Sequence, residues 1–128
     1  MDRVAVLDAS AFMAMIQEEK GAETVTACLP WAIISTVNLA EAVTKLISTG
    51  MEEQVAWWHI AEIDCESVPF DEEQARLAGG LVKITKPYGL SLGDRACLAL
   101  AIQRKATVYT TDGVWKNLSL EIQIEVIR

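Results

Sequence analysis

Four acidic residues stand where they could share one chemical site. Asp8 directly follows a short apolar run, and Asp112 follows a strand-like segment near the end of the chain. Glu41 lies in the second turn of one predicted helix, and Asp94 lies in the first turn of another. In an open parallel sheet, ligands bind at the carboxyl ends of the strands, where the following helices begin. All four carboxylates can therefore converge on that edge.

A cluster of this kind needs a counter-ion, because two carboxylates ~4 Å apart repel by roughly 4 kcal/mol at an effective dielectric constant of about 20. Hard divalent cations, Mg²⁺ or Mn²⁺, take carboxylate and water oxygens as ligands. Such ions hold a scissile phosphate and lower the pKa of an attacking water molecule. The four acids therefore point to metal-dependent phosphodiester hydrolysis, which requires no histidine and no serine nucleophile.

Each acid also has a simpler structural explanation. Asp8 can cap a helix, Asp94 can interact with the positive end of its helix dipole, and Asp112 can begin a turn. Glu41 can pair with Lys45 one helical turn later. Asp94 fits its structural explanation least well, because the rest of its helix is nearly all apolar and an unpaired buried carboxylate is costly.

The elements that must position these acids alternate along the chain. Apolar runs predict buried strands over 4–7, 31–35 and 107–110, a weak strand over 66–70, and an edge strand with one buried face over 121–127. Capping residues and helical periodicity predict helices over 8–19, 22–29, 36–48, 52–63, 72–84 and 93–105. This alternation predicts an α/β fold, a three-layer sandwich whose parallel central sheet of about four to five strands has helices on both faces.

Length and composition support one folded domain over residues 1–128. The chain is 52% apolar and 23% charged, which excludes a disordered or low-complexity protein. Its formal net charge of −7 argues against binding nucleic acid through a broad basic surface. Bound cations could still reverse the field locally. No apolar run is long enough for a signal peptide or a membrane span, so we expect a cytoplasmic protein.

The cysteine pattern argues against a zinc site. Cys28, Cys65 and Cys97 are widely spaced, and His59 is the single histidine. A Cys/His zinc site would need nearly all four residues at spacings unlike those of zinc fingers. We expect buried, reduced cysteines instead.

The order and spacing of the acidic segments resemble those of PIN-domain ribonucleases of the VapC toxin type, which occur in prokaryotic toxin–antitoxin pairs. The resemblance covers essentially the whole chain. The segments that carry it are Val6–Ser10, Asn38–Ala42, Leu90–Ala101 and Thr110–Trp115.

The resemblance implies a Mg²⁺-dependent endoribonuclease, with Mn²⁺ as a possible alternative ion. Asp8 and Asp94 would be the principal metal ligands, and Glu41 and Asp112 would complete the acidic site. Ser10 and Thr110 match small hydroxyl residues near such sites; each could bind a ligand water or simply cap a helix or loop. Arg95, together with the lysines Lys83, Lys86 and Lys116, could contact flanking phosphates. Trp115 stands where the family pattern often has Phe.

The resemblance also implies partners. These are an RNA substrate, a VapB-like antitoxin whose tail crosses the groove and places an Arg in the acidic cluster, and a second copy of the chain in a homodimer. Phe12, Met13, Met15 and Ile16 look like helix packing and could help form the antitoxin groove. Trp57 and Trp58 either contact a partner or pack internally.

Three other functions could be built on an acidic α/β domain. A receiver-like phosphotransfer domain needs a late lysine at the end of a strand, whereas Lys116 follows a turn. A dinucleotide-binding fold needs a G-x-G-x-x-G segment after the first strand, and the chain has none. A non-catalytic protein-interaction module on a PIN scaffold stays open, and the loss of cleavage on replacing Asp94 by Asn would exclude it.

Overall fold

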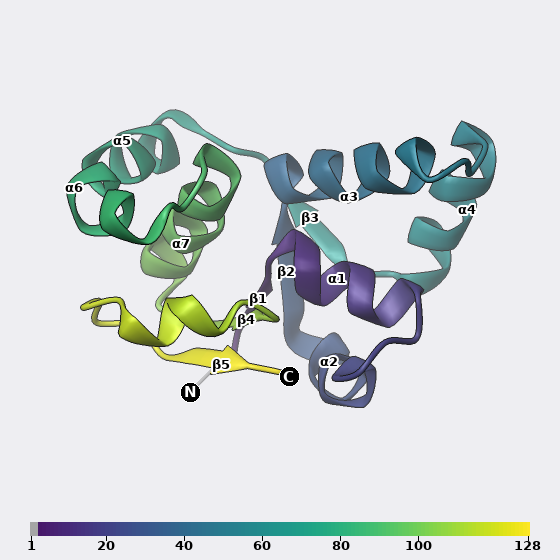
Figure 1. The fold of residues 1–128 in the computed structure, drawn as a ribbon, viewed down its shortest axis with the longest axis horizontal. Coiled ribbons are helices and arrows are strands. Elements are labelled where there is room, and N and C mark those ends of the chain that lie inside the picture. Colours follow the sequence, from purple (N-terminus) through teal and green to yellow (C-terminus); the bar gives the residue numbers. More distant parts are fainter. Residues whose placement is uncertain (1–2) are drawn as a thin grey trace.

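The computed structural model describes residues 3–128 and contains one five-stranded sheet. All four strand pairings are parallel, and the strand order is β3-β2-β1-β4-β5 (Figure 1). The strands are β1 Ala5–Leu7, β2 Ala32–Ser35, β3 Glu66–Val68, β4 Thr107–Thr110 and β5 Ile124–Val126. The predicted α/β fold with a parallel sheet is therefore confirmed.

The helices connect successive strands and cover both faces of the sheet. The α-helices are α1 Ala9–Ile16, α2 Ala22–Cys28, α3 Thr36–Ser48, α4 Glu53–Ile63, α5 Glu72–Gly80, α6 Val82–Thr85 and α7 Leu92–Arg104. The 3₁₀ helices are η1 Leu29–Trp31, η2 Lys86–Tyr88 and η3 Gly113–Asn117. Helices α1 to α4 lie on one side of the sheet, and α5 to α7 lie on the other (Figure 1).

The sheet separates two hydrophobic cores. Ala5 and Leu7 of β1 point into the core formed with α1 to α4, whereas Val6 points into the core formed with α7 and η3. Side chains alternate across a strand, so a central strand with helices on both faces must be apolar at every position. This explains why the run at residues 4–7 shows no alternation of polar and apolar residues.

Several predicted elements are longer than the observed ones. The helix predicted over 72–84 is divided into α5 and α6 around Leu81, because the Gly79–Gly80 pair has low helix propensity. The helix predicted to reach residue 19 ends at Ile16, and Glu18 takes a left-handed conformation with φ 53°. The strand predicted over 66–70 ends at Val68, because a proline lacks the N–H that the ladder needs.

At the edge of the sheet, β5 is shorter than the strand predicted over 121–127. It pairs with β4 only through Ile124, Glu125 and Val126, and all three are half-buried. β5 is nevertheless the edge strand, as predicted, and Ile122 and Ile124 pack against the core on the α7 side; the two faces differ less in exposure than predicted.

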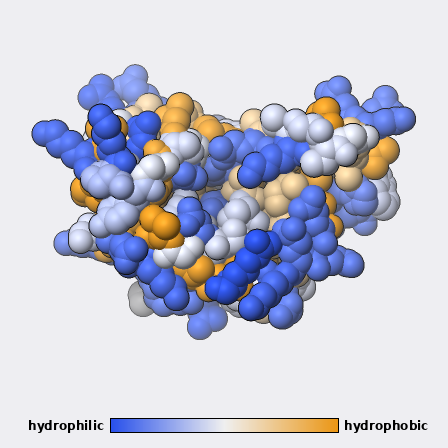
Figure 2. Space-filling view, viewed as in Figure 1, coloured by the Kyte–Doolittle hydropathy of each residue, from blue (hydrophilic) through white to orange (hydrophobic). Residues whose placement is uncertain are grey.

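The surface is mixed in polarity. Figure 2 shows hydrophilic residues interspersed with smaller hydrophobic areas over one face. Trp57 and Trp58 on α4 are 44% and 59% exposed, so neither is buried in the core. Phe12 and Met13 are buried, as expected for helix packing. Among residues 3–128, no helix combines the length and apolar character needed to cross a membrane.

Candidate active site

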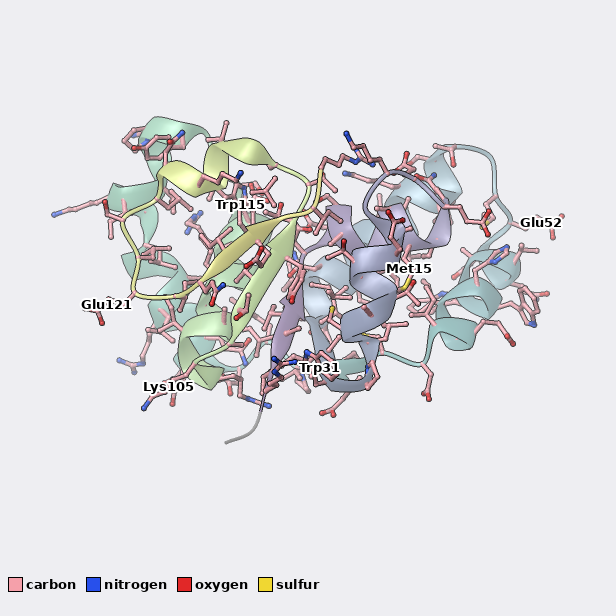
Figure 3. The ribbon with its side chains drawn as sticks, turned by 90° about the horizontal axis from the view of Figure 1, so that it is seen from below. Met15, Trp31, Glu52, Lys105, Trp115 and Glu121 are labelled. Atoms are coloured by element: carbon pink, nitrogen blue, oxygen red, sulfur yellow. The ribbon has the colours of Figure 1, made fainter. Side chains whose placement is uncertain are left out.

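The sheet has a topological switch point between β1 and β4. The chain leaves β1 toward β2 on one side and later returns to add β4 on the other side. In open α/β sheets, ligands bind in the crevice outside the carboxyl ends of the strands at such a point. Asp8 follows β1 there, and Asp112 lies two residues beyond the end of β4. Lys105, which precedes β4, and Trp115, which follows it, lie at opposite ends of the strand (Figure 3).

All four predicted acids line one pocket at this edge, with a volume of about 390 Å³. Its walls come from the β1–α1 junction, α3, α7 and the segment after β4. The lining residues are Asp8, Ala9, Ser10, Glu41, Lys45, Asp94, Thr111, Asp112 and Trp115. The geometry therefore brings together residues that lie more than a hundred positions apart in the sequence.

Asp8 is the most buried of the acids, with 5% of its surface exposed. It caps α1 through a bond from the Ala11 backbone N–H to Oδ1 (2.8 Å), and the Ser10 hydroxyl donates to the same oxygen (2.7 Å). The Thr110 hydroxyl donates to Oδ2 (2.6 Å). Burial raises the pKa of Asp8, and the nearby charge of Asp94 raises it further, while the three hydrogen bonds act in the opposite direction.

Ser10 and Thr110 connect the two loops of the switch point. Besides contacting Asp8, the Ser10 hydroxyl accepts a hydrogen bond from the Thr111 N–H (3.0 Å). The Thr110 hydroxyl accepts one from the Asp112 N–H (3.1 Å). These hydroxyls therefore orient the carboxylate of Asp8 and the loop that carries Asp112.

Glu41 is held against the amino end of α7. The Asn38 side-chain amide donates to Glu41 Oε1 (2.8 Å) and to the Gly93 carbonyl (2.9 Å), which links α3 to α7. A Cβ atom at Gly93 would overlap the Glu41 carboxylate. Glycine is therefore the residue that lets Glu41 reach the pocket at this point.

Asp94 and Asp112 each bond to the backbone at the start of a helix, Asp94 as the third helical residue of a capping box and Asp112 as the N-cap. Asp94 Oδ2 accepts from the Ser91 N–H (2.9 Å) within a capping box at the start of α7. Asp112 Oδ1 accepts from the Val114 N–H (3.0 Å) at the start of η3. Asp8 and Asp112 are thus caps, as their structural explanations predict, and Asp94 lies in the first turn of α7, where the helix dipole favours an acid; all three positions are compatible with a shared site.

Three of the acids keep one oxygen available. Within residues 3–128, Glu41 Oε2, Asp94 Oδ1 and Asp112 Oδ2 receive no hydrogen bond from the protein, while the other oxygen of each is engaged. In the same part of the chain, no three Asp, Glu, Cys or His side chains stand in an arrangement that would hold a metal ion. The carboxylates therefore share one pocket without being drawn together around a single point.

The buried thiol of Cys97, on α7, is close enough to the acids of the pocket for their charges to change its pKa. Burial raises its pKa well above the ordinary value, and the negative charges of Asp8, Asp94 and Glu41 raise it further. Three of the four acids therefore act on one point inside α7. Their donor set of carboxylate oxygens, with hydroxyls and no nitrogen or sulfur ligand, suits Mg²⁺ or Mn²⁺.

The sequence-based choice of residues misses some that contribute to this geometry. Asn38 and Gly93 position Glu41, and an amide one helical turn before an acid, on the same helix face, is the signal that could have identified Asn38. Trp115 lines the pocket although 1% of it is exposed, and its buried indole N–H has no partner within the described chain. Lys45 also lines the pocket.

Arg95 lies elsewhere. Its guanidinium donates to the Ala78 carbonyl (2.9 Å), which ties α7 to α5, and Arg95 is not among the residues that line the pocket. Glu41 and Lys45 do not form the ion pair that their spacing allows. The ion pairs within residues 3–128 involve other residues.

Comparisons with known proteins agree with this fold. The PIN domain family matches residues 5–120. A solved VapBC2 structure from Rickettsia felis, bound to a promoter DNA fragment, is 17% identical, with a TM-score of 0.74 and coverage of 95% of this chain and 97% of that chain. DNA-bound VapBC from Salmonella typhimurium is 15% identical, with a TM-score of 0.75 and coverage of 97% and 98%.

A third similar structure is Mycobacterium tuberculosis VapC20, described as a toxin that cleaves the sarcin–ricin loop. It is 17% identical, with a TM-score of 0.73 and coverage of 93% of this chain and 98% of that chain. No curated protein matches the sequence. The family match spans most of the chain, and the protein therefore belongs to the PIN domain family.

Proposed function

We propose that the protein is a Mg²⁺- or Mn²⁺-dependent endoribonuclease whose metal-binding acids are Asp8, Glu41, Asp94 and Asp112. The observation that carries this proposal is that four carboxylates from four separate segments line one pocket at the switch point of the sheet. Helix and turn capping does not require the four acids to lie near one another, because each acid could cap its own element at any distance from the others.

The protein's own residues would prepare the site for the ion and the phosphate. Asp8 is fixed by three donors, and the free oxygens of Glu41, Asp94 and Asp112 are available to ligate. A divalent cation in the pocket would activate water and neutralise charge that develops on the phosphate. The single histidine, His59, is on α4 and does not line the pocket, so the proposal assigns it no role.

The partners in the proposal are an RNA substrate, a small antitoxin protein and a second copy of the chain. The similar solved structures from Rickettsia felis and Salmonella typhimurium are VapBC assemblies, and VapC20 is described as a toxin that cleaves the sarcin–ricin loop. In this proposal, an Arg of the antitoxin enters the acidic pocket and blocks the metal or the RNA. Co-expression with an antitoxin of this kind should give a complex in which cleavage is inhibited.

A non-catalytic interaction module is the second candidate. The exposed Trp57 and Trp58 favour it, because aromatic residues are enriched in protein interfaces. This function would need neither the metal nor the acids for its activity. A cleavage assay with an acid variant therefore separates the two candidates.

The test is cleavage of RNA by the purified protein with Mg²⁺ or Mn²⁺, by the protein with EDTA, and by Asp94→Asn. We expect EDTA to abolish cleavage and Asp94→Asn to reduce it by about a hundredfold or more, because the metal supplies several kcal/mol of transition-state stabilisation. Asparagine at this position still accepts the capping hydrogen bond from Ser91, so the variant should fold.

Asp71→Asn is the matched control. Asp71 caps α5 through a bond from the Gln74 N–H (2.8 Å) and lies outside the pocket, so this variant should cleave like the wild type. Equal activity of Asp94→Asn and the wild type would contradict the proposal. So would the absence of metal-dependent cleavage from a folded wild-type protein tested on several RNA classes.

A further inference from the structure

A second hollow lies beside the acidic pocket on the surface of α3. Its volume is about 660 Å³, and it is lined by Thr36, Val37, Ala40, Glu41, Thr44 and Lys45. We call it the α3 groove. Glu41 and Lys45 also line the acidic pocket, so the two hollows meet at these two side chains. A ligand chain that leaves the acidic pocket past Glu41 would enter the α3 groove.

The lining of the α3 groove comes from one face of the helix, since its residues recur at helical spacing. Between its ends the groove has small side chains, and Val37 and Ala40 give it an apolar floor. The Thr44 hydroxyl donates to the Ala40 carbonyl (2.8 Å), and the Thr36 hydroxyl accepts from the Phe70 N–H (3.2 Å). The apolar floor formed by Val37 and Ala40 suits the flat face of a nucleoside, and the two threonine hydroxyls beside it keep further hydrogen-bonding capacity for the sugar or base edge.

Lys45 is the single basic residue among those that line the two hollows. It is exposed, and the ion pairs found within residues 3–128 do not include it. The chain carries a net charge of −7, and the pocket itself presents four carboxylates. A phosphate next to the scissile one would therefore meet repulsion on every side of the pocket except where Lys45 stands.

We propose that a single-stranded segment of the substrate RNA continues from the acidic pocket along the α3 groove. Lys45 binds the phosphate adjacent to the scissile one, and the attached nucleoside lies on the surface formed by Val37 and Ala40. This inference rests on the proposed ribonuclease function, and it adds the direction in which the strand leaves the site and the residue that receives its phosphate.

The test compares Lys45→Gln with Lys105→Gln in the full-length protein. Both changes remove one positive charge from an exposed side chain. Lys105, however, precedes β4, at the end of this strand that is opposite to the pocket and to Trp115 (Figure 3). Cleavage of a labelled single-stranded RNA should show KM raised about three- to tenfold in Lys45→Gln, with kcat changed less than twofold. Lys105→Gln should match the wild type, and Lys45→Arg should restore KM.

A second variant tests the groove independently of Lys45. Ala40→Glu places a carboxylate on the exposed groove floor, and it should raise KM by a similar factor. Gln54→Glu adds the same charge on α4, outside both hollows, and should leave KM unchanged. Unchanged thermal melting of each variant excludes misfolding as the cause.

The outcomes separate this inference from the proposed function. If the wild type cleaves RNA and the Lys45 and Ala40 variants behave like their controls, the strand path is wrong and the ribonuclease function stands. If the wild type binds RNA without cleaving it and Lys45→Gln weakens that binding, the groove is correct and the ribonuclease function fails. If RNA is neither bound nor cleaved, or if a protein segment occupies the groove instead, the inference is overturned.

Discussion

Asp8 shows how one residue can be a structural cap and a candidate metal ligand at once. It begins α1, and two hydroxyls and one backbone N–H compensate part of the cost of its burial. Its pKa is nevertheless raised, with burial as the largest cause. A carboxylate kept in such an environment opposes folding when it is ionised, and a bound cation would reverse this effect.

The raised pKa of Asp8 predicts a specific pH dependence of stability. A carboxyl group with a higher pKa in the folded chain binds its proton more tightly there than in the unfolded chain. The free energy of unfolding should therefore decrease as the pH rises above the ordinary pKa of 3.8, until Asp8 ionises in the folded state. Asp8→Asn lacks this contribution, because asparagine does not titrate.

Urea unfolding of the wild type and Asp8→Asn without divalent cations, between pH 4 and pH 7, measures this difference. The stability of the variant relative to the wild type should increase with pH over this range. Mg²⁺ at pH 7 should then stabilise the wild type and leave Asp8→Asn unchanged. If the difference in the free energy of unfolding between wild type and Asp8→Asn is the same at every pH, Asp8 has its ordinary pKa in the folded protein and the prediction is wrong.

At the scale of elements, the site depends on the close approach of α3 and α7. Asn38 donates to both Glu41 and the Gly93 carbonyl, and Gly93 leaves the space that the Glu41 carboxylate occupies. The helix that carries Asp94 and the helix that carries Glu41 are thereby held in a fixed relation. Neither helix could supply this geometry by itself.

Gly93→Ala should separate activity from stability. The new Cβ would overlap the end of the flexible Glu41 side chain, which can turn away at little cost in stability. Alanine also favours the helix by about 0.5–1 kcal/mol. We therefore expect the free energy of unfolding to change by less than about 1 kcal/mol, while RNA cleavage falls by about tenfold or more.

Gly79→Ala is the control for this prediction. Gly79 lies in α5 with open space around it, so alanine should stabilise the protein by about 0.5–1 kcal/mol and leave cleavage unchanged. Urea unfolding and the RNA assay measure both quantities on the same preparations. Full activity of Gly93→Ala would show that the position of Glu41 against α7 is not needed for cleavage.

Element boundaries were less predictable than element types. The alternation of strands and helices predicted the fold class because continuous apolar runs and capped periodic segments follow from burial on both faces of a parallel sheet. The ends of α1, α5 and β3 depend instead on local backbone features, such as the left-handed Glu18 and the proline after Val68. Such features act on only one or two residues, so the hydrophobic periodicity of a whole element does not reveal them.

At the scale of the whole molecule, net charge limits how the protein can hold RNA. With a charge of −7 and one lysine at the two hollows, few phosphates can be neutralised by the protein itself. The slope of log K against log salt concentration for single-stranded RNA should therefore be shallow, about −0.7 to −2 at fixed Mg²⁺. Lys45→Gln should reduce its magnitude by about 0.7.

Fluorescence anisotropy of a labelled RNA between 50 and 200 mM NaCl measures the slope of log K against log salt concentration. For the expected slope, the affinity should change by about one decade or less over this range. Binding in EDTA should be weaker at every salt concentration, because the acids then repel the phosphates. A slope steeper than about −5 would require a basic surface that the composition lacks, and it would contradict the proposed mode of binding.

The sequence by itself predicted the fold class and placed the four acids at one edge of the sheet, where they share a pocket. Asp8 and Asp112 follow strands, and Asp94 and Glu41 lie in the first two turns of helices; this topology brings such positions to one edge of the sheet. Ser10 and Thr110 were suggested by the resemblance to PIN-domain ribonucleases, and the structure places both hydroxyls on Asp8. These predictions succeeded geometrically because strand ends and helix starts are properties of local sequence; the catalytic roles of the residues remain predictions.

Only the tertiary structure decided which other side chains reach the pocket. Lys45 lines both hollows instead of pairing with Glu41, Arg95 binds the Ala78 carbonyl of α5, and Trp115 has an unpartnered indole N–H. Spacing along one helix gives the face on which a residue lies, but its partner depends on how closely the neighbouring helix packs. That distance is set by contacts between residues far apart in the chain, such as Gly93 and Glu41.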